Sequence, residues 1–451
     1  MIRNNKTRLY ETETKIKLKD EYEREYNAIK DKIIQLQVNN PNLDIDENLI
    51  NRLSNDKSLD TREVLKKLKL DSEGYGRIND LLKDDDLEEI MVINDKNPVY
   101  VYHRQKGMMI TNITLQDNEI RQIIEKIANQ VQRKIDKQTP LLDARLPDGS
   151  RINATIPPIT PDGATLTIRK FKKTPITIFD LINTNTISSH LAAFLWMIIE
   201  GMNAYSSNII IAGGTGSGKT TTLNCICSFI PAYERVITIE DTMELQIKHQ
   251  HIIRCETRPP NIENQGEITM DMLLKNSLRQ RPDKIIVGEV RSKEANTLFG
   301  ALNTGHSGMG TLHANSSHET ITRLNNPPMN VPKIMINSLD FIIMQKRLYN
   351  NMKGSIRRVT EVVEVTGMEL DNLQLNKIYE YDPNTDKIEF KAISCNVLNK
   401  IALMKGLTYK DILSEIDRRE EYLIEKVKKN NEHHIDNVEK LIDDYYNTLN
   451  N

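Results

Sequence analysis

The sequence predicts an α/β protein, with a smaller α+β domain before its main sheet and helical regions at both ends. In residues 189–350, buried-strand patterns alternate with helical ones, which is typical of a largely parallel sheet covered by helices. Residues 74–188 instead combine short strands with one amphipathic helix. Both ends of the chain are rich in charge, with apolar residues at helical spacing. The 451 residues are enough for several domains.

The predicted division has four parts: a helical N-terminal region (1–73), an α+β domain (74–188), an α/β domain (189–350) and a C-terminal β-hairpin and helical region (351–451). In the α+β domain we expect strands at 89–93, 98–102, 146–155 and 163–169, and a helix at 118–131. In the C-terminal region we expect antiparallel strands within 356–393, a turn at 381–386 and a charged helix from about residue 409.

The charges nearly cancel, since 61 Lys and Arg stand against 63 Asp and Glu. This balance argues against a whole-chain electrostatic grip on nucleic acid, so no nucleic-acid partner is expected. The longest apolar run, 191–199, is much shorter than the ~20 residues that cross a bilayer, and residues 1–8 lack a leader pattern. We therefore expect a cytoplasmic protein without direct membrane insertion.

The four cysteines are scattered and form no C-x-x-C pair. Neither zinc nor a disulfide framework is expected from this pattern. Cys225 and Cys227 follow a glycine-rich loop within a predicted helix, where we expect them to be buried by packing.

A glycine-rich loop carries the strongest functional signal. The strand pattern 208–212 runs directly into Gly213-Gly-Thr-Gly-Ser-Gly-Lys-Thr220, and a helix-forming run follows. Glycines let such a loop wrap a phosphate with inward N–H groups, and the helix N-terminus adds its positive end. Lys219 should reach the β- and γ-phosphates of ATP, and Thr220 should hold Mg²⁺. The predicted nucleotide-binding residues are Gly213, Gly214, Thr215, Gly216, Ser217, Gly218, Lys219, Thr220 and Thr221.

Two further strand patterns end in carboxylates. The segment 235–244 ends with Glu240, Asp241 and Glu244. The segment 283–291 carries Gly288 where many P-loop enzymes have Asp, which leaves Glu289 to act on magnesium, through water. Two strands that end in carboxylates beside a phosphate loop favour chemistry over simple capping.

A glycine-rich segment, 304–315, follows the Glu289 strand and its helix. His306 and His313 lie toward its two ends. We expect these histidines to sense the γ-phosphate or to relay its state to a neighbouring site, whereas His103, His190, His249 and His251 are interpreted as structural.

In their order and spacing these segments resemble the secretion ATPase superfamily, whose Walker A, Asp box, atypical Walker B and His box match 213–220, 239–245, 286–291 and 304–315. The upstream runs 142–153 and 97–104 are similar to the archaeal type IV pilus, archaellum and tight-adherence pilus branch. The chain lacks the four-cysteine zinc insertion of bacterial type II members, which supports that branch.

The resemblance implies a RecA-like P-loop NTPase core and a role for each matching residue. Glu244 would orient the attacking water, Glu289 would act on Mg²⁺, and His306 and His313 would couple sites. Three arginines of the smaller domain would face the phosphates from the same or a neighbouring subunit: Arg145, Arg151 and Arg169. The resemblance also implies a homo-hexamer that works with a membrane platform protein at the inner face of the cell membrane.

These inferences predict an ATP-hydrolysing motor for protein secretion or for assembly of a type IV-like pilus or archaellum. One alternative is a RecA-like nucleic-acid translocase, although the sequence lacks a basic-aromatic groove. Another is a nucleotide-gated scaffold with little turnover, against which Glu244 and Glu289 argue. The charged flanks, 1–72 and 409–451, are expected to be free surfaces for partners.

Overall fold

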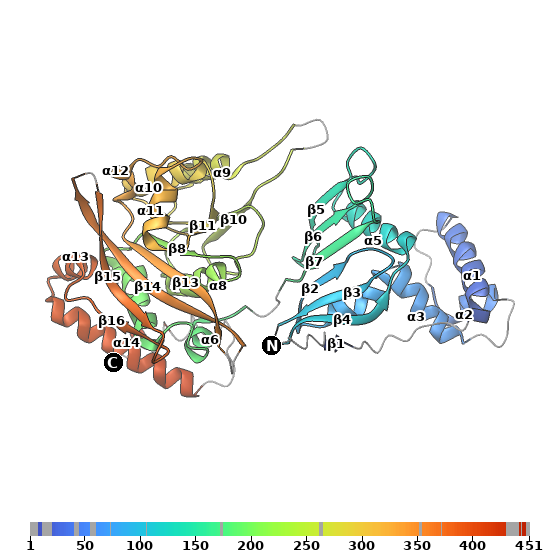
Figure 1. The fold of residues 1–451 in the computed structure, drawn as a ribbon, viewed down its shortest axis with the longest axis horizontal. Coiled ribbons are helices and arrows are strands. Elements are labelled where there is room, and N and C mark those ends of the chain that lie inside the picture. The colour runs from blue at the N-terminus through green and yellow to red at the C-terminus, as the bar shows by residue number, and fades with distance from the viewer. Residues whose placement is uncertain are drawn as a thin grey trace, which may run out of the picture. The chain divides into compact units, whose positions relative to one another are not determined.

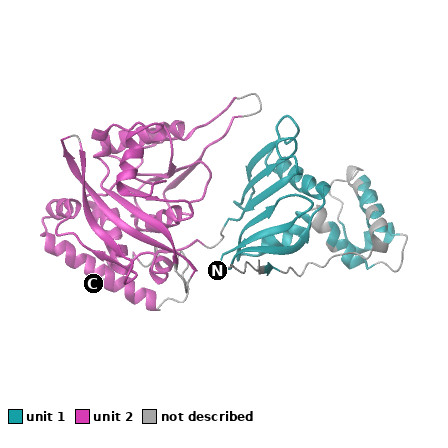
Figure 2. Cartoon of the chain, in the orientation of Figure 1, with its two compact units in different colours: residues 1–173 teal, residues 174–451 magenta. Residues whose placement is uncertain are grey.

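The computed structural model describes residues 8–10, 20–39, 45–54, 60–72, 74–104, 106–171, 175–260, 265–350, 354–370, 372–429, 442 and 444–447. The chain divides into two compact units, residues 1–173 and 174–451 (Figure 2). Each unit has its own sheet, and the buried hydrophobic residues around each sheet belong to that unit alone.

A seven-stranded sheet with the order β1-β4-β3-β2-β7-β6-β5 forms the centre of the first unit. Its strands are β1 (Arg8–Tyr10), β2 (Leu87–Val92), β3 (Pro98–His103), β4 (Gly107–Thr114), β5 (Leu141–Arg145), β6 (Arg151–Thr155) and β7 (Thr165–Arg169). The short β1 pairs parallel with β4, and the other pairs are antiparallel. The strands β1, β4 and β5 were not among those predicted from the sequence.

Helix α5 (Asp117–Gln130) covers this sheet because its isoleucines recur at helical spacing. Ile120, Ile124 and Ile127 are fully buried in one core with the strand residues Ile90 and Ile168. Four more helices belong to the unit: α1 (Asp20–Asn39), α2 (Glu47–Leu53), α3 (Thr61–Ser72) and α4 (Asn79–Lys83). The first three share a small separate core around residues such as Tyr26, Ile50 and Val64.

The second unit has a nine-stranded sheet with the order β10-β9-β11-β12-β8-β13-β14-β15-β16 (Figure 1). Its strands are β8 (Ile209–Gly213), β9 (Val236–Glu240), β10 (Ile252–Glu256), β11 (Lys284–Val290), β12 (Ser307–Leu312), β13 (Phe341–Asn350), β14 (Gly354–Glu369), β15 (Asn372–Asp382) and β16 (Lys387–Phe390). The first six strands in spatial order pair in parallel, and the last three extend the sheet by antiparallel pairing. The predicted parallel core and the predicted turn near 381–386 are confirmed.

Helices cover both faces of the second sheet: α6 (Ile178–Asn183), α7 (Ser189–Glu200), α8 (Lys219–Ile226), α13 (Asn396–Lys405) and α14 (Tyr409–Lys429) pack into one core, and α9 (Met270–Ser277), α10 (Glu294–Asn303), α11 (Ser317–Asn325) and α12 (Lys333–Ile336) into the other. The side chains of β8 alternate between these cores, with Ile209 and Ile211 in the first and Ile210 in the second. Such two-sided burial explains the continuous apolar runs of the sequence. Cys225 and Cys227 are buried, as predicted.

Two boundaries differ from the predicted division. The units separate between Lys173 and Thr174, earlier than 188/189, because Ile178 and Phe179 of α6 are buried in the core beneath α7 and α8. The C-terminal region does not stand apart after residue 350, since β14 pairs along the length of β13 and continues the same sheet.

The expectation that the C-terminal flank is a free surface is wrong for α14 and for the described residues that follow it. Arg419 of α14 is buried and forms ion pairs with Glu200 of α7 at 2.9 Å and with Glu415 at 3.1 Å. The Tyr445 hydroxyl donates to Glu415 at 2.8 Å, and its ring packs against Trp196. The charged sequence of α14 therefore includes a buried residue that binds the helix to the core through ion pairs.

None of the helices within the described ranges is both long and apolar enough to cross a lipid bilayer.

Candidate nucleotide-binding site

The predicted phosphate loop lies between β8 and α8, at the edge of the sheet where the parallel strands end. β8 is buried throughout, and α8 begins at Lys219 with Gly218 as its N-cap. Around the bend Thr215 is exposed, Gly214, Thr220 and Thr221 are half-buried, and Ser217 is buried. The strand, loop and helix thus take the arrangement that the sequence predicts, with the helix N-terminus behind the loop.

Two glycines of the loop have no room for a side chain. A Cβ on Gly213 would come 2.1 Å from the backbone oxygen of Gln345 on β13, which pairs with Gly213. Gly218 has φ +95°, and a Cβ there would lie 3.1 Å from Arg357 and from the Gln345 amide. The close approach of β13 and β14 and the left-handed turn therefore require glycine at these positions.

Lys219 lies inside the curve of the loop. Its ammonium group donates to the Gly214 carbonyl at 3.1 Å and lies 3.4 Å from Nε2 of His313, which follows β12. Burial lowers the pKa of Lys219, while the charges of Glu289 and Glu244 oppose that lowering. A buried ammonium group at the mouth of such a loop is suited to an anion such as phosphate.

Buried hydroxyls support the assignment of this loop to a bound phosphate. The hydroxyls of Ser217 and Thr222 are buried and have no hydrogen-bond partner within the described parts of the chain. Ser217 belongs to the loop, whereas Thr222 lies in the first turn of α8 behind it. An unpaired buried hydroxyl in a loop that also holds a lysine is expected where a ligand supplies the missing contact. The loop residues therefore fit a nucleotide phosphate group.

Glu289 of β11 lies at the centre of a charged cluster on the same sheet edge. One of its carboxylate oxygens lies 2.6 Å from Arg291 Nη2, and the other lies 3.3 Å from His313 Nε2. Burial alone would raise the pKa of Glu289, but the hydrogen bond and charge of Arg291, with His313 and Lys219, lower it. Burial and the charge of Lys219 lower the pKa of His313, while the charge of Glu289 opposes that lowering.

Glu244 follows β9 in a loop that a second glutamate anchors. One carboxylate oxygen of Glu240 accepts the backbone N–H groups of Glu244 and Leu245 at 2.7 and 2.9 Å. Burial raises the pKa of Glu240 to about 7. The charge of Glu244 contributes to raising the pKa of both Lys219 and Arg291.

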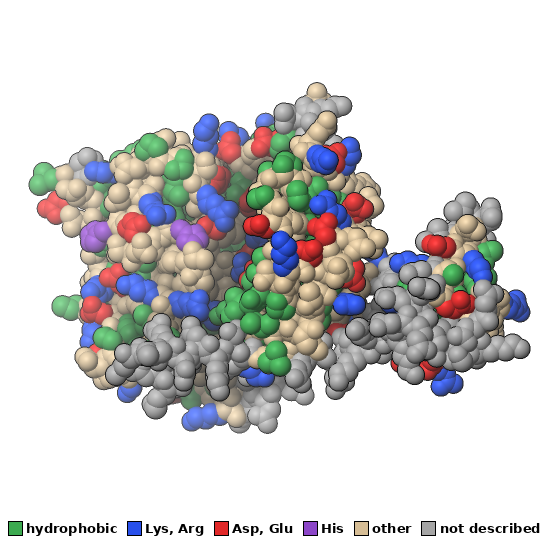
Figure 3. Space-filling model, turned by 45° about the vertical axis from the view of Figure 1, so that its right-hand side comes forward, with side chains coloured by type: hydrophobic (Ala, Val, Ile, Leu, Met, Phe, Trp, Pro, Cys, Tyr) green, Lys and Arg blue, Asp and Glu red, His purple; other side chains and the backbone are tan. Residues whose placement is uncertain are grey.

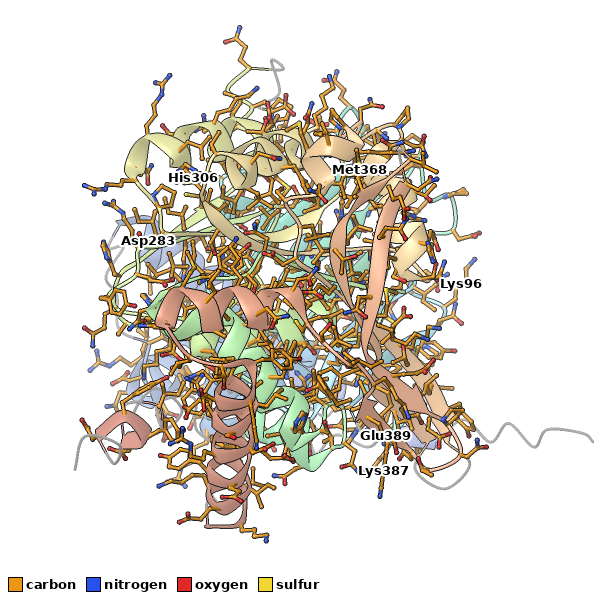
Figure 4. All side chains as sticks on the ribbon, turned by 90° about the vertical axis from the view of Figure 1, so that its left-hand side faces the viewer. Lys96, Asp283, His306, Met368, Lys387 and Glu389 are labelled. Carbon is orange, nitrogen blue, oxygen red and sulfur yellow. The ribbon has the colours of Figure 1, made fainter. Side chains whose placement is uncertain are left out.

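The two histidines of the glycine-rich segment lie at opposite ends of β12. His313 follows the strand beside Lys219, whereas His306 precedes it, near Asp283 at the start of the paired strand β11 (Figure 4). The strand between them spans about 20 Å at 3.3 Å per residue. Within one chain, only His313 of this pair contacts the residues around the phosphate loop.

The three predicted arginines form a row across the sheet of the first unit. Arg145 of β5 pairs directly with Arg151 of β6, which pairs in turn with Arg169 of β7. Residues directly opposite in antiparallel strands project from the same face, and like charges in such positions repel. Glu89 on β2 is the next residue in the row. A row of three arginines is suited to an anion with several charges.

Two charged residues of the site, Glu240 and Arg291, are not in the set predicted from the sequence. Glu240 is the first of the three carboxylates after the β9 pattern, and its place as the last residue of a buried strand was a usable signal. Arg291 is exposed and follows the buried strand β11, so its sequence position gives no sign of a role in the site. Its contact with Glu289 shows that it belongs there.

Comparisons with known proteins show the family of this chain. The sequence profile described as "Type II/IV secretion system protein" matches residues 71–443. An uncharacterised protein of Methanocaldococcus jannaschii is 34% identical, with 80% of this chain and 74% of that protein covered. The type IV secretion system protein VirB11 of Bartonella henselae is 30% identical, with 63% of this chain and 90% of that protein covered.

Among solved structures, the ATPase DotB of Legionella pneumophila matches with a TM-score of 0.45 and 19% identity, over 78% of this chain and 87% of that one. The pilus retraction motor PilT matches with a TM-score of 0.45 and 18% identity, over 76% and 92%. Since the family profile spans most of the sequence, this chain belongs to the type II/IV secretion system protein family.

Proposed function

We propose that this protein is an ATP-hydrolysing motor that powers protein secretion or assembly of a type IV-like pilus or archaellum. The observation that carries the proposal is the meeting of Lys219, His313 and Glu289 beside a glycine-rich loop in which the buried hydroxyl of Ser217 is unpaired. Family membership narrows the chemistry to that of secretion ATPases. Relatives named as pilus, secretion and conjugal transfer proteins support a role in moving macromolecules.

In this proposal the loop N–H groups and Lys219 bind the β- and γ-phosphates of ATP. The Thr220 hydroxyl would hold Mg²⁺, which supplies charge neutralisation at the phosphates. Both oxygens of Glu289 already have protein partners, so Glu289 would meet the metal through water. His313 connects Lys219 to Glu289, and it would report whether the phosphate site is filled.

Glu244 is the proposed residue that orients the attacking water. Glu240 fixes the backbone of the loop that carries Glu244, and the charge of Glu244 acts on Lys219, which supports this role. Asp241 is less suited, because its exposed carboxylate contacts Thr257 at 2.9 Å and lies 3.6 Å from Arg291. A carboxylate that accepts a proton from water needs to remain ionised near neutral pH.

The row formed by Arg145, Arg151 and Arg169 would stabilise charge on the phosphates, from the same or a neighbouring subunit. An arginine in such a role supplies ~10³–10⁵ in rate. We further propose a homo-hexamer that acts on a membrane platform protein and works in the cytoplasm at the membrane surface. His306 would act in this scheme by coupling neighbouring sites rather than by contacting the phosphate in its own chain.

The test of ATP hydrolysis is Lys219→Ala, which removes the buried cation of the loop. We expect weaker ATP binding and nearly abolished turnover, measured with a fluorescent nucleotide and by phosphate release. Normal turnover in this variant would reject the proposal. A nucleic-acid translocase is the alternative, and stimulation of wild-type hydrolysis by single-stranded DNA would favour it. On the face shown in Figure 3, basic and acidic side chains are interspersed.

Sharing of arginines between subunits is tested by mixing two inactive variants, Lys219→Ala and Arg145→Ala. If the arginines act across an interface, mixed rings regain part of the wild-type activity, because some sites combine an intact loop with an intact arginine row. Mixed assembly is verified by differential tags. Verified mixed rings without recovered activity would show that the arginines act within one chain.

A further inference from the structure

The phosphate loop has a hydrogen-bond partner on a strand far from it in sequence. Arg357 of β14 donates through its Nε–H group to the carbonyl oxygen of Gly216, at 3.1 Å. Gly216 lies at the bend of the loop with φ +70°. The bond therefore joins the bend of the loop to β14, the first of the antiparallel strands that extend the sheet.

The position of this bond matters because of peptide geometry. In a trans peptide the C=O of one residue and the N–H of the next point in opposite directions. With the Gly216 carbonyl bound to Arg357, the Ser217 N–H points to the opposite side of the peptide, where it donates to the Gly214 carbonyl oxygen at 3.3 Å. Lys219 donates to the same oxygen, so this N–H lies on the side of the loop that holds the lysine. Inward N–H groups of this kind are the groups with which such loops bind phosphate.

A second arginine lies beside Gly216. Arg347 of β13 is directly opposite Arg357 in the β13–β14 pair, and a Cβ on Gly216 would lie 3.5 Å from its Nη1. Two like charges in opposite positions of an antiparallel pair destabilise the pairing unless an acceptor or anion compensates. Arg347 donates to Ser355 of β14 at 2.6 Å, and Arg357 donates to Gly216 of the loop, so each guanidinium group has an acceptor of its own.

The two faces of the β13–β14 pair are distinct. Gln345, Arg347 and Arg357 lie on the face that meets the loop. Lys346 lies on the other face and lines a cavity of about 620 Å³ with residues such as Leu348 and Ile356. The strand thus offers a neighbouring cation, exposed like Arg357, that does not touch the loop.

We propose that Arg357 is a positioning residue for nucleotide binding: it holds the Gly216–Ser217 peptide so that the Ser217 N–H faces the bound phosphate. The inference rests on the proposed function, because it requires that the loop binds ATP. Without this hydrogen bond the glycine peptide can rotate, and the loop then loses part of its preorganised set of donors.

The experiment compares full-length wild-type protein with Arg357→Ala, Arg357→Lys and Lys346→Ala. For Arg357→Ala we expect the Kd for ATP and the KM to rise about five- to ten-fold, the effect of losing one ordinary solvent-accessible hydrogen bond. We expect kcat to change less than about two-fold, because the residues near the γ-phosphate remain. The Lys346→Ala variant removes the same charge from the opposite face and should retain wild-type KM.

Arg357→Lys separates orientation from charge. Lysine keeps the positive charge but has no N–H group at the Nε position, so we expect KM to stay raised. Wild-type KM in Arg357→Lys would overturn the inference in favour of simple charge attraction. Equal KM increases in Arg357→Ala and Lys346→Ala, or none in either, would also overturn it. If the wild-type protein does not bind ATP, the proposed function is wrong. That outcome is distinct from failure of this inference, which is judged from the variants relative to a wild-type protein that does bind ATP.

Discussion

Gly288 of β11 lies directly against the side chain of Glu240 on β9. A Cβ built on Gly288 would come 2.9 Å from Cγ of Glu240. The two strands are adjacent and parallel, and Glu240 uses the space to reach the backbone of Glu244 and Leu245. The glycine that stands where many P-loop enzymes carry Asp is therefore required by the neighbouring carboxylate.

Gly288→Ala is expected to destabilise the protein by about 1–3 kcal/mol, because the added methyl group overlaps Glu240. The displaced Glu240 would also loosen the loop that carries Glu244, so ATP turnover should fall more than ATP binding. Thermal unfolding and phosphate release are the measurements. Gly300→Ala in α10 is the matched control, since a Cβ there meets only Met335 at 3.7 Å. Equal behaviour of the two variants would contradict the packing argument.

Glu240→Gln should change how stability depends on pH. Burial raises the pKa of Glu240 from 4.5 to about 7, with smaller contributions from Glu244 and Glu256. Between these values the unfolded chain has released the proton and the folded protein keeps it, so stability falls as pH rises. Glutamine at position 240 does not titrate. The free energy of unfolding of the variant should therefore vary with pH by up to about 3 kcal/mol less than that of the wild-type protein.

Urea unfolding of wild-type protein and of Glu240→Gln at pH 5 and pH 8 measures the difference in slope. A wild-type protein that gains stability relative to the variant between these two pH values would contradict the raised pKa.

Glu244→Gln is expected to retain ATP binding and to lose turnover by at least ~10²-fold, because the amide keeps its shape but is a weaker acceptor for the proton of water. Binding of a fluorescent nucleotide and phosphate release are measured on the same sample. Thr257→Val, which removes a contact to the neighbouring Asp241, serves as control and should retain most of the activity. If both properties survive in Glu244→Gln, Glu289 becomes the better candidate for orienting water.

Arg419→Ala is expected to cost about 3–5 kcal/mol of stability, because Glu200 and Glu415 are then left buried with fewer partners. Arg418 is the control on the same helix: it pairs with Glu415 at 2.7 Å, but its side chain is 58% exposed. Arg418→Ala should cost no more than about 1 kcal/mol. Similar melting temperatures for the two variants would show that α14 is not anchored through Arg419.

The sequence by itself determined the local chemistry: the phosphate loop, the carboxylates at strand ends and the alternation of strands and helices in the second unit. Glycine spacing, buried strand runs and helix-forming runs are contiguous, so their physical cause lies within a few residues. The family profile also follows from these contiguous segments.

Only the tertiary structure decided which distant residues meet. The contact of Arg357 with Gly216 joins positions 141 residues apart, and the contact of Glu240 with Gly288 depends on β9 lying beside β11. Strand order and register set both contacts, and neither leaves a local pattern, because each strand is compatible with several neighbours. The anchoring of α14 by Arg419 could not be predicted for the same reason. A helix rich in charged residues is expected to be exposed to solvent, and only the structure shows that Arg419 has buried partners.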